Sequence, residues 1–277
     1  MTLAEVLRGA TDYLARKGVG TPRLDAELLV GRALGLERIE LYTQHDRPLT
    51  TVEREAVREV VRRRGRREPL AYVLGDWGFR RLVLATDRRA LVPRPETEIV
   101  VERCLALLAG REAPRVLEVG VGSGAIALAL ADEHPGARVV ATDLSTDALA
   151  LARENAARLG LEVELVEGDL FAGLEGPFDL VVSNPPYVGE EELPSLEPEV
   201  RDWEPRAAVV DRGQTRRIAE AAREQLDGAL VLEVHETRAD EVARLLAELG
   251  YAQVEVTEDL AGRPRVVEGR YRRATIV

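Results

Sequence analysis

The sequence has few of the residues that build metal, redox or disulfide sites. It contains one cysteine, Cys104, and three histidines, which are scattered at His45, His134 and His235. A single cysteine cannot close an internal disulfide, and the histidines do not have the spacing of zinc ligands. Cys104 falls in the apolar pattern of an expected helix, so we expect it to pack in the core. These absences disfavour redox and zinc chemistry, and we expect no metal site.

Long apolar runs are also missing. No stretch approaches the roughly 18 uncharged apolar residues that a membrane span needs. The first residues carry acidic side chains where a secretory signal needs an apolar centre. We therefore expect a protein of the cytoplasm that makes no membrane contact. Its 277 residues, 45% of them apolar, are enough for one large domain or two smaller ones with a sizeable core.

Positive charge is in deficit. There are 38 lysine and arginine residues against 49 acidic ones, which gives a formal net charge of −11. Phosphate contacts need a positive surface, so we do not expect an extended grip on nucleic acid. A local run of arginines at 62–67 is flanked by glutamates. We interpret it as the solvated end of a helix, near the negative pole of the helix dipole, and a contact with RNA is the alternative.

The pattern along the chain predicts three parts. Residues 1–74 have helical spacing of apolar positions, and residues 75–92 contain a short alternation, 79–84, that predicts a hairpin linker. From residue 115 onward, strands alternate with helices, which predicts a doubly wound, mostly parallel sheet in a domain spanning 93–277. The expected strands are 116–119, 139–142, 163–166, 178–182, 229–234 and two more near Val254 and Val266.

A glycine-rich loop falls where the first of these strands turns into a helix. It consists of Gly120, Val121, Gly122, Ser123 and Gly124. Glycines let the backbone come close to a ligand. Asp143 ends the next strand, about 20 residues on, where a carboxylate can accept hydrogen bonds from both hydroxyls of a ribose. The loop predicts a nucleoside-bearing cofactor, but it fits NAD and S-adenosylmethionine equally.

Two later strand ends decide between these cofactors. Asp169 and Leu170 follow the third strand, where they can contact an adenine amino group and its ring. Asn184, Pro185, Pro186 and Tyr187 follow the apolar run 178–183 and offer an amide, an outward-pointing backbone carbonyl and an aromatic face. This tetrapeptide fits an amino group on a flat molecule and has no evident role in hydride transfer. It therefore favours S-adenosylmethionine, and a plain surface turn is the alternative.

The same residues carry a family resemblance. The segment 118–125, Asp143 and the tetrapeptide at 184–187 look like the pattern of class I S-adenosylmethionine-dependent methyltransferases that act on nitrogen. Further segments resemble the release-factor glutamine N5-methyltransferase family (HemK/PrmC), and they lie at 21–29, 68–72, 93–98, 204–208 and 259–262. The likeness runs from about Leu3 to Arg270. Leu170 departs from it, because many members have an aromatic residue there, and the segment 209–214 is shorter than expected.

The resemblance implies a helical N-terminal substrate-recognition domain, a hairpin linker and a Rossmann-like class I methyltransferase domain with a mostly parallel seven-stranded sheet. It also implies that the methyl group of S-adenosylmethionine passes to the glutamine of the Gly-Gly-Gln motif in class 1 peptide-chain release factors, leaving S-adenosylhomocysteine. We expect the protein to act as a monomer.

We assign roles to the residues as a hypothesis. Asn184 and Pro185 accept the two N–H groups of the substrate amide, Tyr187 packs on the amide plane, and Pro186 keeps the turn rigid. The expected cofactor contacts are Gly120, Val121, Gly122, Ser123, Gly124, Asp143, Asp169, Leu170 and Asn184. An adenine-N6 DNA or RNA methyltransferase is the closest alternative, because an adenine amino group fits the same residues. An NAD-dependent oxidoreductase and a non-catalytic binding protein are more distant ones.

Overall fold

The computed structural model of the chain describes residues 1–272 and divides them into two compact units. The first unit comprises 1–76 together with 196–203, and the second comprises the remaining described residues. In the described part of the chain, no helix is long and apolar enough to cross a lipid bilayer.

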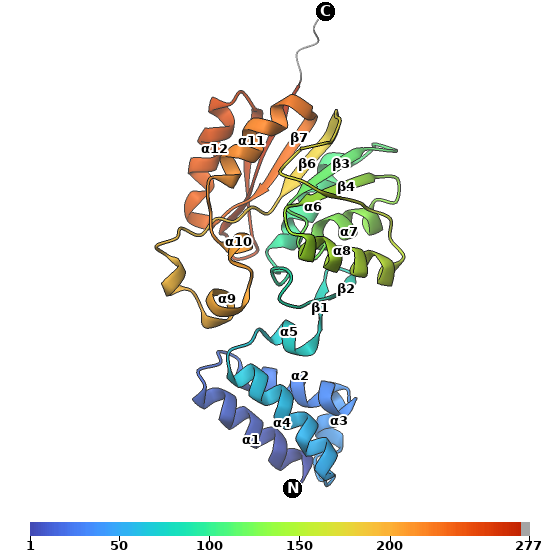
Figure 1. Ribbon diagram of the computed structural model, residues 1–277, viewed down its shortest axis with the longest axis vertical. Coiled ribbons are helices and arrows are strands. Elements are labelled where there is room, and N and C mark those ends of the chain that lie inside the picture. Colours follow the sequence, from blue (N-terminus) through green and yellow to red (C-terminus); the bar gives the residue numbers. More distant parts are fainter. Residues whose placement is uncertain (273–277) are drawn as a thin grey trace, which may run out of the picture. The chain divides into compact units, whose positions relative to one another are not determined.

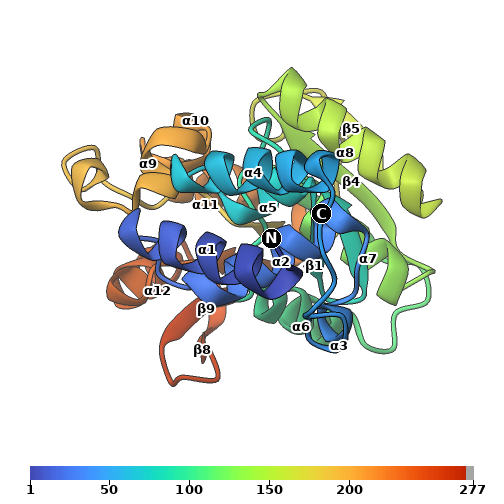
Figure 2. The ribbon, with the colours of Figure 1, turned by 90° about the horizontal axis from the view of Figure 1, so that it is seen from below.

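The first unit is a bundle of short helices. Its elements are α1 (Leu3–Arg16), α2 (Pro22–Leu34), α3 (Arg38–Thr43), α4 (Thr51–Gly65), α5 (Leu70–Leu74) and α9 (Pro198–Trp203). Capping boxes begin α1 and α4, where Thr2 pairs with Glu5 and Thr50 with Glu53, so the first N–H groups of each helix are satisfied. The helices α1, α2 and α4 lie side by side (Figures 1 and 2) around a fully buried core that includes Leu3, Leu14 and Leu29.

The arginine run at the end of α4 is only partly solvated. Arg62 and Arg66 are exposed, as expected, but Arg64 is 6% exposed and Arg67 is half-buried. Arg64 donates to Asp25 of α2 at 2.6 Å and to Glu199 of α9 at 2.7 Å. The interpretation of the whole run as a solvated helix end is therefore wrong. Its inner arginines hold α9, a segment that follows the tetrapeptide at 184–187, within the first unit.

The second unit is built on a seven-stranded sheet. Its strands are β3 (Arg115–Val119), β4 (Arg138–Asp143), β5 (Glu164–Glu167), β6 (Phe178–Ser183), β7 (Leu226–Glu233), β8 (Ala252–Glu258) and β9 (Pro264–Tyr271). They lie in the order β5-β4-β3-β6-β7-β9-β8, in which β3 to β7 run parallel and β9 pairs antiparallel with both β7 and β8. This topology confirms the predicted fold class. The chain reverses its strand order between β3 and β6, where open α/β sheets place their ligands.

Helices cover both faces of this sheet (Figure 1). The helices α6 (Thr97–Leu108), α7 (Ala125–Glu133) and α8 (Thr146–Leu159) pack on one face, and α11 (Gln214–Gln225) and α12 (Ala239–Glu248) pack on the other. Figure 2 shows α8 running beside β4 and β5. Neighbouring strand residues such as Val116 and Leu117 belong to opposite clusters, as the pleat of a strand with two buried faces requires. Cys104 is fully buried in α6, as predicted.

Shorter elements complete the second unit. The strands β1 (Asp76–Phe79) and β2 (Leu82–Ala85) form a two-stranded sheet at the expected hairpin, and β1 begins at the last residue of the first unit. The other short elements are a single turn at Leu193–Ser195, α10 (Arg206–Val209) and a second turn at Glu236–Arg238.

Candidate active site

The glycine loop follows β3 at the carboxyl edge of the sheet. Its three glycines have φ values of 82°, 54° and 88° at Gly120, Gly122 and Gly124, a region that side chains with a Cβ rarely adopt. A Cβ on Gly124 would also lie 2.9 Å from Leu128 Cδ1. Both constraints explain why glycine stands at these positions, and they leave the loop backbone open to close approach by a ligand.

Asp143 at the end of β4 fastens this loop. Its Oδ2 accepts the N–H of Gly122 at 3.0 Å, and its Oδ1 accepts the N–H of Ser145 at 2.9 Å. A carboxylate has about four lone-pair sites, so each oxygen keeps one for a further donor. The half-buried carboxylate can therefore orient the loop and accept a ribose hydroxyl at the same time.

Two buried side chains that sequence reasoning missed support the loop. Asn155 of α8 is fully buried, accepts the N–H of Ala85 at 2.6 Å and donates to the carbonyls of Ala85 and Ser123 at 3.1 and 2.9 Å. It thereby ties β2 to the glycine loop. Glu118 accepts the N–H of Ala127 at 2.8 Å, and its burial raises the pKa of its carboxyl well above the usual range. In the sequence, Asn155 looks like an ordinary helix residue. Glu118 stands just before the glycines, and this position could have identified it as part of the site.

A cavity of about 280 Å³ opens beside the loop. Ten of the predicted site residues line it: Gly120, Val121, Gly122, Ser123, Asp143, Asp169, Leu170, Asn184, Pro185 and Pro186. The predicted residues Gly124 and Tyr187 are not among its lining residues. The segment 89–94 and Thr97 form another part of the wall. The cavity thus gathers the ends of β3, β4, β5 and β6 at one edge of the sheet.

Asp169 and Leu170 have partners within the chain. Asp169 Oδ2 pairs with Arg217 Nη2 of α11 at 2.6 Å, and both side chains are about half exposed. Leu170 adopts a φ of 55°, which costs a residue with a Cβ about 1 kcal/mol. Its carbonyl accepts the Thr142 hydroxyl at 2.9 Å. The strained backbone of Leu170 is therefore held from β4, at the edge of the cavity.

The tetrapeptide lies where β6 ends, as predicted. The Ser183 hydroxyl donates to the carbonyl of Val119 at 2.7 Å, which joins the ends of β6 and β3. Asn184 Nδ2 donates to Thr97 Oγ1 at 3.3 Å. Pro185 is buried and Pro186 half-buried.

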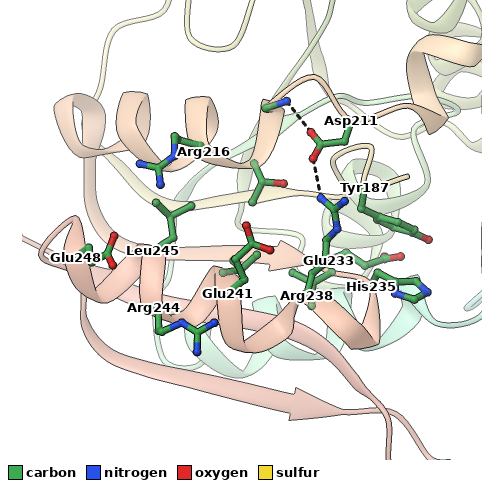
Figure 3. A pocket seen from close by; sticks show the side chains of 14 residues that line it. Tyr187, Asp211, Arg216, Glu233, His235, Arg238, Glu241, Arg244, Leu245 and Glu248 are labelled. Atoms are coloured by element: carbon green, nitrogen blue, oxygen red, sulfur yellow. Dashed lines mark hydrogen bonds and ion pairs between the residues drawn. The ribbon is translucent and has the colours of Figure 1, made fainter. Parts of the chain in front are cut away.

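Tyr187 lines the edge of a second cavity, of about 330 Å³, which Figure 3 shows from close by. There its ring lies 5.8 Å from the ring of His235, and Glu233 lines the same cavity. Burial raises the pKa of the Tyr187 hydroxyl, so the side chain stays neutral.

Two of the remaining motifs meet beside the first cavity. Arg94 Nη2, from the segment 93–98, contacts Glu204 Oε2 at 2.5 Å, and the N–H of Val92 donates to Glu204 Oε1 at 3.3 Å. Burial raises the pKa of Glu204, and Arg94 opposes this effect. The ion pair holds 204–208 against the cavity wall, which Pro205 and Ala208 help to form. Neither residue was predicted to have a role.

No group of three or more potential metal ligands lies together among residues 1–272. The polar groups around the first cavity include backbone amides of the glycine loop, the carboxylates of Asp143 and Asp169 and the side-chain amides of Asn184 and Gln214, which suit a sugar, a base and an amide substrate.

The fold and this cavity define a methyltransferase of the Rossmann-like class. Residues 97–196 match the family described as methyltransferase small domain. A solved methyltransferase from Pyrococcus furiosus has the same fold, with a TM-score of 0.52 and 21% identity over 68% of this chain and 88% of that one. Membership of this class indicates S-adenosylmethionine-dependent activity.

Full-length relatives identify the family. Residues 5–75 match the family described as PrmC N-terminal domain. Release factor glutamine methyltransferases from Geobacter sulfurreducens and Deinococcus radiodurans are each 44% identical to the chain, the first over 97% of this chain and 96% of the relative, the second over 98% and 99%. The chain belongs to the release factor glutamine methyltransferase family, which confirms the resemblance inferred from its motifs.

Proposed function

We propose that this protein transfers a methyl group from S-adenosylmethionine to the side-chain amide nitrogen of the glutamine in the Gly-Gly-Gln motif of class 1 peptide-chain release factors. The observation that carries this proposal is the state of Asn184. Its side chain lines the cavity beside the glycine loop and engages Thr97 through Nδ2, which leaves the carbonyl oxygen Oδ1 for a substrate N–H. The near-full-length match to relatives with this activity supports the choice of substrate.

The cavity residues fit the methyl donor. The positive φ values of Gly120 and Gly122 leave the loop backbone free of side chains, so it can approach the amino-acid part of the donor closely. Asp143 has lone pairs left for a ribose hydroxyl, and Asp169 and Leu170, which line the same cavity, contact the adenine in this proposal. When bound, S-adenosylmethionine supplies an electrophilic methyl group on a sulfonium.

The substrate nitrogen must be made more nucleophilic, because its lone pair is delocalised into the amide carbonyl. Asn184 Oδ1 and the backbone carbonyl of Pro185 accept its two N–H groups. Both dipoles then favour the positive charge that develops on nitrogen as the new bond to carbon forms. Pro186 has no N–H and fixes φ, so it keeps the Pro185 carbonyl in place. The nitrogen loses a proton after alkylation, so no dedicated base is needed.

Tyr187 and the N-terminal helical domain make further contacts with the substrate. Tyr187 directly follows Pro186 in the chain, and its ring packs on the plane of the substrate amide. The N-terminal helical domain, 1–74, binds the release factor, the hairpin at 75–92 connects it to the catalytic domain at 93–277, and the enzyme acts as a monomer in the cytoplasm, where release factors work.

Methyl transfer from a labelled donor tests the proposal. Purified protein is offered a class 1 release factor, double-stranded DNA and RNA in separate reactions. We expect label in the release factor alone, and almost none in the same reaction time when Asn184→Ala replaces the wild type. Label in adenine of the nucleic acids would establish the alternative, an adenine-N6 methyltransferase, in place of this proposal.

A further inference from the structure

The side chain of Asn184 is held from behind by two buried residues. Within residues 1–272, Asn184 Nδ2 donates a hydrogen bond to Thr97 Oγ1 at 3.3 Å. Thr97 is the first residue of α6 and is 4% exposed. Glu233, the last residue of β7, lies behind Thr97 as seen from Asn184 and is 3% exposed.

Glu233 is an unusual residue to bury at this point. Burial raises the pKa of its carboxyl to about 7, although a hydrogen bond from the Thr97 hydroxyl acts in the opposite direction. In the described part of the chain, its Oε2 has no hydrogen-bond partner. Figure 3 shows Glu233 close to Tyr187 and His235, at the wall of the second cavity. Burying a carboxyl with one unpaired oxygen is costly, which points to a role in the site rather than in the core.

The chemistry of these three groups gives the chain of hydrogen bonds a direction. An ionised carboxylate only accepts, so it takes the single O–H of Thr97. The Thr97 oxygen is then left as an acceptor, and only the Nδ2 end of the Asn184 amide can face it. Consequently Oδ1, the acceptor end, must face the cavity.

We propose that Thr97 and Glu233 are positioning residues that fix the orientation of the Asn184 side-chain amide, so that its oxygen faces the substrate nitrogen. This inference rests on the proposed function, because it assigns the reason why Asn184 can serve as an acceptor. In the opposite orientation, Nδ2 would face the substrate. Its N–H groups would then meet the N–H groups of the substrate amide, and donors cannot hydrogen-bond to donors. The pair therefore supplies the preorganisation that electrostatic stabilisation requires.

The direction of the chain also depends on the protonation of Glu233. A protonated Glu233 can donate to Thr97, which frees the Thr97 hydroxyl to donate to Asn184 Oδ1 and turns the amide around. The charged groups that act on Glu233 are Glu96, which favours its protonated form, and Arg265 and Arg94, which favour the ionised form. Tyr187 and His235 are its titratable neighbours in the cavity. We therefore expect kcat to fall on the acid side of about pH 7 as Glu233 takes up its proton.

Substitutions at Thr97 test the orientation. Thr97→Val keeps the shape and removes the hydroxyl, whereas Thr97→Ser keeps the hydroxyl. Thr257→Val, at a half-buried position of the mostly exposed edge strand β8, is the control for the same chemical change. Each full-length variant is assayed for methyl transfer to a class 1 release factor, for S-adenosylhomocysteine binding by calorimetry and for its melting temperature.

We expect Thr97→Val to lower kcat about 100-fold, the size of effect seen when one preorganised hydrogen-bonding group is lost. Thr97→Ser should stay within about 5-fold of wild type and Thr257→Val should equal it, while cofactor affinity changes little in all three. Thr97→Val should melt a few degrees lower than wild type, because it leaves the buried Glu233 carboxyl without its donor. A Thr97→Val enzyme with nearly wild-type kcat would overturn the inference, and so would a Thr97→Ser enzyme as slow as Thr97→Val. Failure of the wild type to methylate the release factor would instead contradict the proposed function.

Glu233→Gln adds a readout that a purely structural role would not move. Glutamine can accept from Thr97 or donate to it, so it no longer imposes a direction. We expect a lower kcat and the disappearance of the acid limb near pH 7 from its pH profile. An acid limb that persists unchanged in Glu233→Gln would assign that titration to another group and contradict the part of the inference that concerns Glu233.

Discussion

Arg64 and Glu199 form an ion pair of 2.7 Å although 135 residues separate them in the chain. The side chain of Arg64 is 7% exposed and that of Glu199 is 17% exposed. Arg64 also contacts Asp25 at 2.6 Å and the carbonyl of Glu68 at 3.1 Å. Burial raises the pKa of Glu199, but Arg67 and Arg64 outweigh it, so the net shift is downward and Glu199 is ionised at neutral pH.

The first prediction concerns the buried ion pairs that Arg64 forms with Glu199 and Asp25. Arg64→Met should lower the free energy of unfolding by about 3 kcal/mol, because it leaves two carboxylates without their buried partner. Arg62→Met, on the same helix as Arg64, should change it by less than about 0.5 kcal/mol, since Arg62 is exposed. Urea unfolding measures both. Equal stabilities for the two variants would show that the buried arrangement does not contribute as described.

The second prediction concerns Asp143. Asp143→Ala removes an acceptor for the ribose and also releases the N–H groups of Gly122 and Ser145. Loss of charge-assisted hydrogen bonds costs about 1.5 to 3 kcal/mol, so the dissociation constant for S-adenosylmethionine should rise at least about 10-fold. Calorimetry gives this constant directly. The exposed Asp147→Ala is the control and should bind like wild type, and an unchanged constant in Asp143→Ala would remove the ribose assignment.

The third prediction separates catalysis from cofactor binding at Asn184. Asn184→Ala should lower kcat about 100- to 1,000-fold, because one of the two acceptors for the substrate N–H groups is lost. The affinity for S-adenosylhomocysteine should fall much less, since the glycine loop and Asp143 remain. Single-turnover rates and calorimetry on the same preparation measure both quantities. A variant that turns over like wild type with excess substrate would rule out the acceptor role.

The fourth prediction is a pH dependence of stability. The pKa of Glu233 is raised by burial from its ordinary 4.5 to about 7, so between these values the folded protein holds a proton that the unfolded chain has lost. Stability from this group is therefore present below about pH 4.5 and is lost as the pH rises towards 7.

Glu233→Gln should remove this loss. Between pH 5 and pH 8, the free energy of unfolding of the wild type should fall by up to about 3 kcal/mol relative to that of Glu233→Gln. Glu118 and Glu204, whose carboxyl pKa values are also raised by burial, remain in both proteins and cancel from the comparison. Parallel stability profiles would show that Glu233 does not keep its proton.

The sequence was sufficient to predict the strands and the strand ends at which the site residues lie. The apolar run before Asn184 predicted a strand ending near 182, and β6 spans Phe178–Ser183. The helix expected after the glycine loop begins at Ala125, because Gly124 has a φ of 88° and stands outside it. Local periodicity fixes such elements because the relevant neighbours are close in sequence.

Long-range partners were not predictable in the same way. Asn155 meets Ala85 and Ser123 only after α8 packs on the sheet, and Thr97 meets Asn184 only after α6 does. In the sequence, Arg64 looks like one more solvated charge, because no residue near it in the chain indicates that Glu199 pairs with it. Periodicity gives the face of a helix, whereas these contacts depend on which distant segment covers that face.

In the proposed reaction, the methyl acceptor is a glutamine side chain bound by Asn184 and Pro185. The most direct measurement is peptide mapping by mass spectrometry of a class 1 release factor after reaction with this enzyme and S-adenosylmethionine. We expect one added methyl group, on the side-chain nitrogen of the glutamine in the Gly-Gly-Gln motif, and almost none after the same reaction time when the enzyme carries Asn184→Ala. A methyl group on another residue, or the same modification with the Asn184→Ala enzyme, would contradict it.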